Sequence, residues 1–177
     1  MTFQALSPSQ TFIPDITAIR TDLETTQSAY QKLVQSIPTP DLDRPLVISK
    51  WTVRQVLTHL CIALEQANPM MVNQARKRQP MPAFLNSRVG HWMNYQMAVW
   101  QARKATPQSL AERYAAANVK FLQLLAGVQG EEWQLNTAMP DGTPLTMEQV
   151  FYVPGQHLAL HGSWIKQTLG GNGGSEQ

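Results

Sequence analysis

The stretch Val153-Pro-Gly-Gln-His157-Leu-Ala-Leu-His161-Gly-Ser-Trp164-Ile-Lys166 places two of the chain's four histidines four residues apart in a helical context. Side chains at positions i and i+4 of a helix lie one above the other, so both imidazole rings can reach the same metal ion. The spacing alone is a weak signal, because it also arises by chance. A metal site therefore requires a third ligand, and the candidate is His59.

His59 lies in the stretch Trp51-Thr-Val-Arg-Gln-Val-Leu-Thr-His59-Leu60, which has the pattern of a helix start. Thr52 and Gln55 have the Thr-x-x-Gln spacing of a capping box. Apolar residues then recur at helical spacing and predict a buried face: Val53, Val56, Leu57, Leu60, Leu64, Ala67 and Met71. His59 flanks this face, so its ring can point into the interior. Pro69 predicts a bend late in this second helix.

The last predicted helix carries the histidine pair and opens with a second capping box, formed by Thr146 and Gln149. One face collects apolar residues and both histidines, which take core positions: Val150, Val153, His157, Leu160, His161 and Trp164. Pro154 and Gly155 interrupt this run. Either the helix kinks there, or a short helix ends and a new one begins just before His157.

Two more long helices are predicted. The first begins near Asp15, and Pro38 and Pro40 end it. Its apolar residues recur at helical steps: Ile16, Ile19, Leu23, Tyr30, Leu33, Val34 and Ile37. The other begins at Thr106-Pro107, an N-cap followed by proline at the first helical position. Its stripe has the clearest heptad-like spacing in the chain: Leu110, Tyr114, Ala117, Phe121, Leu124 and Val128.

These patterns predict an all-α fold, a four-helix bundle at residues 15–169. A shorter helical segment at about 90–104 lies between the second and third long helices. Residues 38–50 and 131–145 are rich in proline or turn residues and are expected to be loops. No strand-like alternation competes with the helices. Residues 1–14 are expected to form an N-terminal arm, and residues 170–177 a flexible tail.

Composition restricts the class of protein. The chain has 177 residues, 43% of them hydrophobic and only 15% charged. A net charge of +2 is too small to indicate nucleic-acid binding. No apolar stretch approaches the length of a membrane span, and the N-terminal residues lack an export signal. The single cysteine, Cys61, excludes an internal disulfide. We therefore expect a cytoplasmic protein with a small-molecule substrate.

Three imidazoles favour zinc or nickel, with ferrous iron as a further candidate, over magnesium or calcium, which prefer oxygen ligands. Three protein ligands leave a coordination position open for water or a substrate thiolate. Leu158, Ala159 and Leu160 stand between the two histidines of the pair. The glutamate of a His-Glu-x-x-His metalloprotease is therefore absent, and that class is rejected.

Simpler interpretations stand beside these. His157 and His161 could be hydrogen-bonded interior histidines. Cys61 faces away from His59 and is expected to be a buried, inert thiol. His91 is expected to be a surface or capping residue. A basic group could bind the carboxylates of a thiol co-substrate or be a solvated face: Arg76, Lys77, Arg78 and Arg88. The tryptophans are expected mainly in the core, although Trp92 and Trp164 could line a pocket.

The motif around His59, followed about a hundred residues later by His157-x-x-x-His161, resembles the DinB/YfiT-like superfamily over roughly residues 15–169. This superfamily includes mycothiol-dependent maleylpyruvate isomerases and thiol S-transferases. The resemblance implies a four-helix bundle in which His59, His157 and His161 hold a divalent metal. It also implies a low-molecular-weight thiol as co-substrate.

Two classes of function follow from the resemblance. One is a metal-dependent enzyme that catalyses S-transfer, isomerisation or detoxification of a small electrophile. The alternative is a non-catalytic binding or stress-response bundle whose metal is structural or adventitious. A homodimer is left open.

Overall fold

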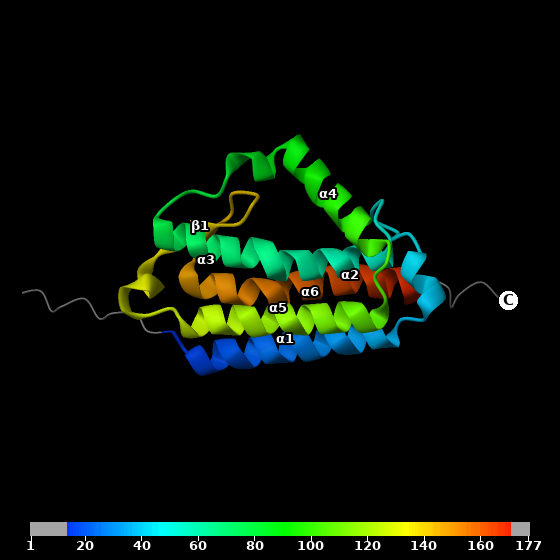
Figure 1. The fold of residues 1–177 in the computed structure, drawn as a ribbon, viewed down its shortest axis with the longest axis horizontal. Helices are drawn as coiled ribbons and strands as arrows, with labels where there is room; N and C mark the ends of the chain where they lie inside the picture. Colours follow the sequence, from blue (N-terminus) through cyan, green and yellow to red (C-terminus); the bar gives the residue numbers. More distant parts are fainter. Residues whose placement is uncertain (1–13, 171–177) are drawn as a thin grey trace, which may run out of the picture.

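The computed structural model describes residues 14–170, which form a bundle of long helices packed side by side (Figure 1). Its helices are α1 (Ile16–Ser36), α2 (Val53–Ile62), α3 (Asn68–Lys77), α4 (Arg88–Ala102), α5 (Pro107–Ala126) and α6 (Met147–Gly170). α2 and α3 are joined by a π-helical turn (Ala63–Ala67) into one long helix. The predicted all-α bundle is therefore confirmed. The predicted arm and tail fall outside the described residues, apart from Pro14 and Gly170.

The directions of the four long helices explain why the shorter helix α4 is needed. α1 packs against α5 and α6, and the α2–α3 helix packs against the same two neighbours. α1 and α6 run in one direction along the bundle, while α2–α3 and α5 run in the other (Figure 1). After α3 the chain must therefore return along the bundle before α5 can begin. The 3-10 turn η3 (Ala83–Asn86) and α4 make this crossover, which is the predicted shorter helix.

The predicted helix starts are confirmed by their hydrogen bonds. The Asp15 side chain accepts from the backbone N–H of Ala18 and caps α1. Thr52 with Gln55 and Thr146 with Gln149 each form a reciprocal capping box. Thr106 accepts from the N–H of Ser109 at the start of α5. These caps satisfy N–H groups that have no partner inside a helix, so local sequence defines where the long helices begin.

A wider, π-helical turn directly precedes Pro69, where the sequence predicts a bend. The N–H of Asn68 bonds to the carbonyl of Ala63, five residues earlier. Proline has no N–H, and its ring crowds the carbonyl four residues before it, here that of Glu65. Widening the preceding turn relieves that clash without ending the helix. His59 lies in the regular part of the helix before this turn.

α6 is one continuous helix, so the alternative in which it splits before His157 is wrong. Pro154 is buried inside it. A Cβ on Gly155 would lie 3.1 Å from both Asp22 Oδ2 and Thr26 Oγ1 of α1. Glycine therefore allows α1 to approach α6 closely, and packing against α1 supports the helix where proline removes a backbone hydrogen bond.

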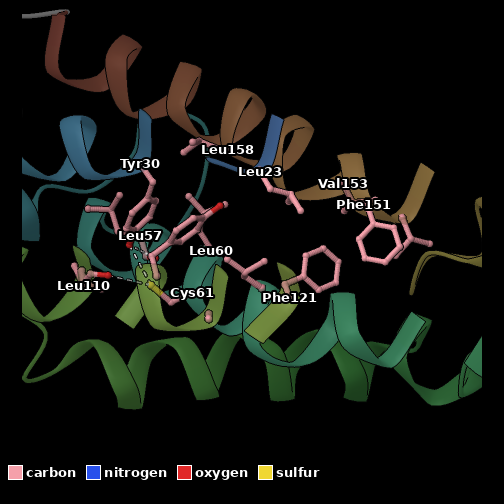
Figure 2. Close-up of a cluster of buried hydrophobic side chains, with 14 of the residues drawn as sticks. Leu23, Tyr30, Leu57, Leu60, Cys61, Leu110, Phe121, Phe151, Val153 and Leu158 are labelled. Carbon is pink, nitrogen blue, oxygen red and sulfur yellow. Dashed lines mark hydrogen bonds between the residues drawn. The ribbon is translucent and has the colours of Figure 1, made fainter. Parts of the chain in front are cut away.

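The core follows most of the predicted stripes, with two shifts in register. Figure 2 shows part of this core, in which Leu110 and Phe121 pack among residues of the other helices. Leu125 is fully buried, whereas Leu124 is only half-buried. A straight helix has 3.6 residues per turn, so a strict heptad pattern drifts off the buried face. In α6, Leu158 is buried and Leu160 is 51% exposed, contrary to prediction.

The predicted loop at 131–145 contains a short β-hairpin, which the sequence pattern did not indicate. β1 (Asn136–Ala138) pairs antiparallel with β2 (Pro144–Thr146), after the 3-10 turn η4 (Gly130–Gln134). Gly142 has φ of 91°, which suits the tight turn. Three-residue strands are too short for alternation to show in the sequence. The predicted loop at 38–50 likewise contains a 3-10 turn, η1 (Thr39–Asp43).

None of the helices formed by residues 14–170 has the length and apolarity that crossing a bilayer would require.

Candidate metal centre

The three predicted ligands meet between neighbouring helices. His59 comes from α2, and His157 and His161 come from consecutive turns of α6. The Nε2 atom of His157 lies 3.2 Å from that of His59 and 2.9 Å from that of His161. Ligand atoms of all three rings lie within 4.8 Å of one another. The fold thus brings together side chains that are 98 residues apart in sequence.

The rings are neutral at physiological pH. Burial lowers the pKa of His59 to about 4, although the Asn94 side chain acts to raise it. Burial also lowers the pKa of His157 to about 3, helped by the repulsion expected from His59 and His161 if they are charged. For His161, burial and then the charge on His59 lower the pKa to about 4. Neutral imidazole is the form that ligates a metal, because its unprotonated nitrogen has a free lone pair.

The three rings cannot provide hydrogen-bond partners for all of their nitrogens, and a bound cation would take up the remaining lone pairs. The Nε2 atom of His157 faces those of His59 and His161, and two facing nitrogens can share at most one proton. The Nδ1 atoms of His59 and His161 are buried and have no hydrogen-bond partner in the protein. Buried polar atoms without partners are costly and call for an explanation. If the protons reside on Nδ1, the Nε2 lone pairs converge on one point.

The spacing of the nitrogens suits a small divalent ion. Tetrahedral zinc with Zn–N bonds of about 2.0–2.1 Å separates its nitrogen ligands by about 3.3 Å. The observed separations of 3.2 and 2.9 Å from His157 are close to this value. In the part of the chain that the structure describes, this cluster contains no carboxylate or thiol. An all-imidazole set favours zinc, nickel or iron over magnesium.

Aromatic rings hold the histidines in place. The ring of Trp51 contacts His59 edge to face, with ring centroids 5.0 Å apart. Trp164 contacts His161 in the same way at 4.4 Å. Tyr95 of α4 contacts Trp51 at 5.7 Å, so the crossover helix supports the wall of the site. Such contacts restrict ring rotation and thereby pre-organise the ligands.

Some of these neighbours escaped prediction from the sequence. Trp51 is next to a recognised helix start, but its contact with His59 follows from the way the chain turns before α2. Asn94 and Tyr95 lie in α4 and reach the site only because α4 crosses over α2. No local motif marks them. Of the two tryptophans predicted as pocket residues, Trp164 lies at the site, whereas Trp92 is 60% exposed on α4.

The other candidate residues lie elsewhere. Cys61 is buried and bonded to Tyr30, as expected of an inert thiol. His91 is exposed on α4 and outside the cluster, as expected. In the basic group, Arg76 forms an ion pair with Glu132, with Nε and Oε1 2.9 Å apart. A cavity of about 720 Å³ also lies elsewhere, near the hairpin.

Comparison with known proteins agrees with this fold. The model of the mycothiol maleylpyruvate isomerase N-terminal domain family matches residues 23–164. No curated protein matches the chain.

Solved structures that are similar to the chain include those of two proteins. Mycothiol-dependent maleylpyruvate isomerase has 11% identity and a TM-score of 0.65 over 86% of this chain and 61% of the isomerase. The chain therefore spans about three fifths of the isomerase's length. YfiT from Bacillus subtilis, described as a probable metal-dependent hydrolase with an unusual four-helix bundle topology, has 17% identity and a TM-score of 0.63. That match covers 93% of this chain and 94% of YfiT. Because the family model matches most of the bundle, the chain belongs to the mycothiol maleylpyruvate isomerase N-terminal domain family, within the DinB/YfiT-like superfamily.

Proposed function

We propose that the chain is a divalent-metal-dependent enzyme that acts on a small electrophile with a low-molecular-weight thiol as co-substrate. The observation that carries this proposal is the convergence of three neutral imidazoles without a carboxylate beside them. His59, His157 and His161 would hold the ion. A divalent ion held there supplies Lewis-acid chemistry, lowering the pKa of a thiol or water in the site.

The protein residues supply binding and order. Trp51 and Trp164 fix two of the rings and offer apolar surface beside them. Asn94 is the polar neighbour from the crossover helix. Since the cluster contains no carboxylate, no side chain in it resembles the general base that a metalloprotease uses. A free thiol has a pKa near about 8.5 and needs only a modest reduction to ionise at pH 7, so thiol chemistry suits a site without a base.

Hydrolysis is the second candidate. It is supported by the match to YfiT, which extends over nearly the full length of both chains, whereas the isomerase is a longer protein. Water without a protein base would depend wholly on the Lewis acid for activation, since bulk water has a pKa of about 15.7. The absence of a carboxylate from the cluster is therefore the reason to rank thiol transfer or isomerisation first.

The test is metal analysis of protein purified without added metal or a histidine tag, followed by titration with thiols. We expect about one divalent ion per chain. After replacement by cobalt, addition of mycothiol, bacillithiol or glutathione should produce a thiolate-to-cobalt charge-transfer band. At least one of these thiols should then be transferred to a reactive electrophile. Hydrolysis of esters or amides without any spectral response to thiols would favour the second candidate.

Cys61→Ser is the matched control, because Cys61 is a thiol on α2 that faces away from the histidines. Burial raises the pKa of Cys61 to about 11, so it stays protonated and unreactive. Its replacement should leave the transfer intact, and His157→Ala should remove it. A protein that binds metal but neither thiol nor electrophile would support the non-catalytic alternative. A small-molecule substrate, a cytoplasmic location and a homodimer stay predictions from the sequence.

A further inference from the structure

A cavity of about 720 Å³ among the described residues is open to solvent. It lies between the end of α3, the turn η3 and the β-hairpin, and we refer to it as the hairpin groove. Figure 1 shows the hairpin beneath the crossover that leads into α4. None of the three histidines, and neither Trp51 nor Trp164, lines this groove. It is therefore separate from the metal centre.

The walls of the groove are mostly apolar and come from both sides. Met81 and two prolines line it from the crossover, and Leu135 and Met139 line it from the hairpin. Asn86 Nδ2 donates a hydrogen bond of 3.0 Å to the carbonyl of Asp141, which fastens η3 to the tip of the hairpin. Cavities of about 300–1,000 Å³ with apolar walls and a few polar groups are typical of small-molecule sites.

Arg78 is the one charged residue that lines the groove. It has no ion pair among the described residues, whereas Arg76, two residues earlier, is paired with Glu132. Arg78 also caps α3 with φ of 52°, in the left-handed region. Glycine or asparagine occupies such a position at lower cost. An arginine there is costly to the fold, which suggests that its side chain has another use.

Thr137 is one of the uncharged polar residues of the wall. It lines the groove from β1, and its hydroxyl oxygen is buried without a hydrogen-bond partner in the protein. Buried hydroxyl groups are normally paired, and a bound molecule that reached this one after a small local shift of the wall would give it a partner. A guanidinium and a hydroxyl beside apolar walls provide donors for a single anionic group and contact for an apolar body.

We propose that the hairpin groove binds a small amphipathic carboxylate. Its apolar chain would lie between Met81 and Met139, and its carboxylate would accept hydrogen bonds from Arg78 and Thr137. The charge of the lining decides the class of ligand, because Arg78 has no acidic counterpart in the groove. A neutral or cationic molecule would leave this arginine without a partner. The site goes beyond the proposed metal chemistry and does not depend on it.

Octanoate is a suitable probe, and octan-1-ol is its uncharged counterpart. Titration of the full chain, followed by amide chemical shifts and calorimetry, should show that octanoate binds at least tenfold more tightly than octan-1-ol. The largest shifts should fall on the end of α3 and on the hairpin. Equal binding of the acid and the alcohol would overturn the proposal. So would shifts confined to the exposed tryptophans of α4, or no binding at millimolar concentration.

Arg78→Asn tests the anion contact without disturbing the fold, because asparagine tolerates the left-handed region. It should weaken octanoate binding at least tenfold, the loss expected for a hydrogen-bonded charge. Arg78→Lys should keep part of the affinity. Arg88→Gln is the matched control, since Arg88 is exposed at the start of α4 and does not line the groove. It should change the affinity less than twofold.

Thr137→Val keeps the shape of the side chain and removes its hydroxyl, and it should weaken octanoate binding several-fold without affecting octan-1-ol. If Arg78→Asn and Thr137→Val both bind octanoate as the parent does, the proposed contacts are wrong. Binding that is lost equally in Arg78→Asn and Arg88→Gln would also contradict the proposal, because it would report only the overall charge of the protein.

Discussion

His59 and Cys61 lie two residues apart on α2 and face opposite kinds of environment. The hydroxyl of Tyr30 donates to the carbonyl of Leu57 at 2.9 Å and lies 3.2 Å from Cys61 Sγ (Figure 2). The ring of Tyr30 stacks on that of Tyr114, with centroids 4.0 Å apart. On the side that faces α6, the Nε2 atom of His59 lies 3.2 Å from that of His157, and the Nδ1 atom of His59 has no hydrogen-bond partner.

The polar cluster around Cys61 is structural, whereas the cluster around His59 is suited to binding a ligand. Around Cys61 the polar atoms bond to one another, and burial raises the pKa values of Tyr30 and Cys61, which keeps both neutral. Around His59 the nitrogens converge but cannot satisfy one another. Satisfied buried polar groups stabilise a fold, and unsatisfied ones cost stability unless something binds them. Each of the following predictions tests one side of this contrast.

The largest effect is expected from a substitution in the hydrophobic core. Leu125→Asp should lower the free energy of unfolding by roughly 4 kcal/mol or more, because it buries an unpaired charge in a fully buried position. Leu124→Asp, on the half-buried neighbour, is the matched control and should cost much less. Urea denaturation followed by circular dichroism measures both. Equal losses would mean that the register of α5 is wrong.

On the metal side, His157→Ala should reduce bound metal from about one ion per chain to near zero while leaving the helical content unchanged. His157 is the ring whose Nε2 is close to both others, so its loss leaves only two ligands. Metal analysis by mass spectrometry measures the stoichiometry. His91→Ala, on exposed α4, should retain the metal. Full retention in His59→Ala, His157→Ala and His161→Ala alike would refute the site.

Acid should destabilise the folded protein through the histidine cluster, in which buried ring nitrogens lack hydrogen-bond partners. The folded-state pKa values of the three histidines, about 4, 3 and 4, lie below the usual value of 6.5 because of burial. The unfolded state therefore binds protons first as the pH falls, and protein stripped of metal should lose stability between about pH 6.5 and pH 3. Stability should be independent of these groups above that range. His157→Leu should flatten the pH dependence of the melting temperature, and an unchanged slope would contradict the assignment.

The smallest effect is expected from Tyr30→Phe. It removes one buried hydroxyl that bonds to Leu57 and lies beside Cys61, which should cost about 1–2 kcal/mol of unfolding free energy. Metal stoichiometry should not change, because the tyrosine lies on the other side of α2 from the histidines. Thermal melts and metal analysis of the same sample test both statements. A loss of metal without a loss of stability would show that the two clusters are coupled.

Much of this arrangement could be predicted from the sequence. Capping patterns at Thr52, Thr106 and Thr146 marked the helix starts because a cap depends on residues within one turn. The proximity of His59, His157 and His161 was also predictable, since i,i+4 spacing and a flanking position on an apolar stripe follow from helix geometry. The hairpin at 136–146 was not, because strands of three residues leave too little pattern.

The sequence by itself determined the helices, the two faces of α2 and the histidines that could share an ion, because these depend on periodicity within single elements. Tertiary structure alone decided how α6 tolerates Pro154, which Gly155 supports by letting α1 pack closely. It also decided that α4 crosses back to place Tyr95 against Trp51, and that a groove forms between Arg78 and the hairpin. These contacts join segments far apart in the chain, and their free energy arises only when the whole bundle excludes water between them.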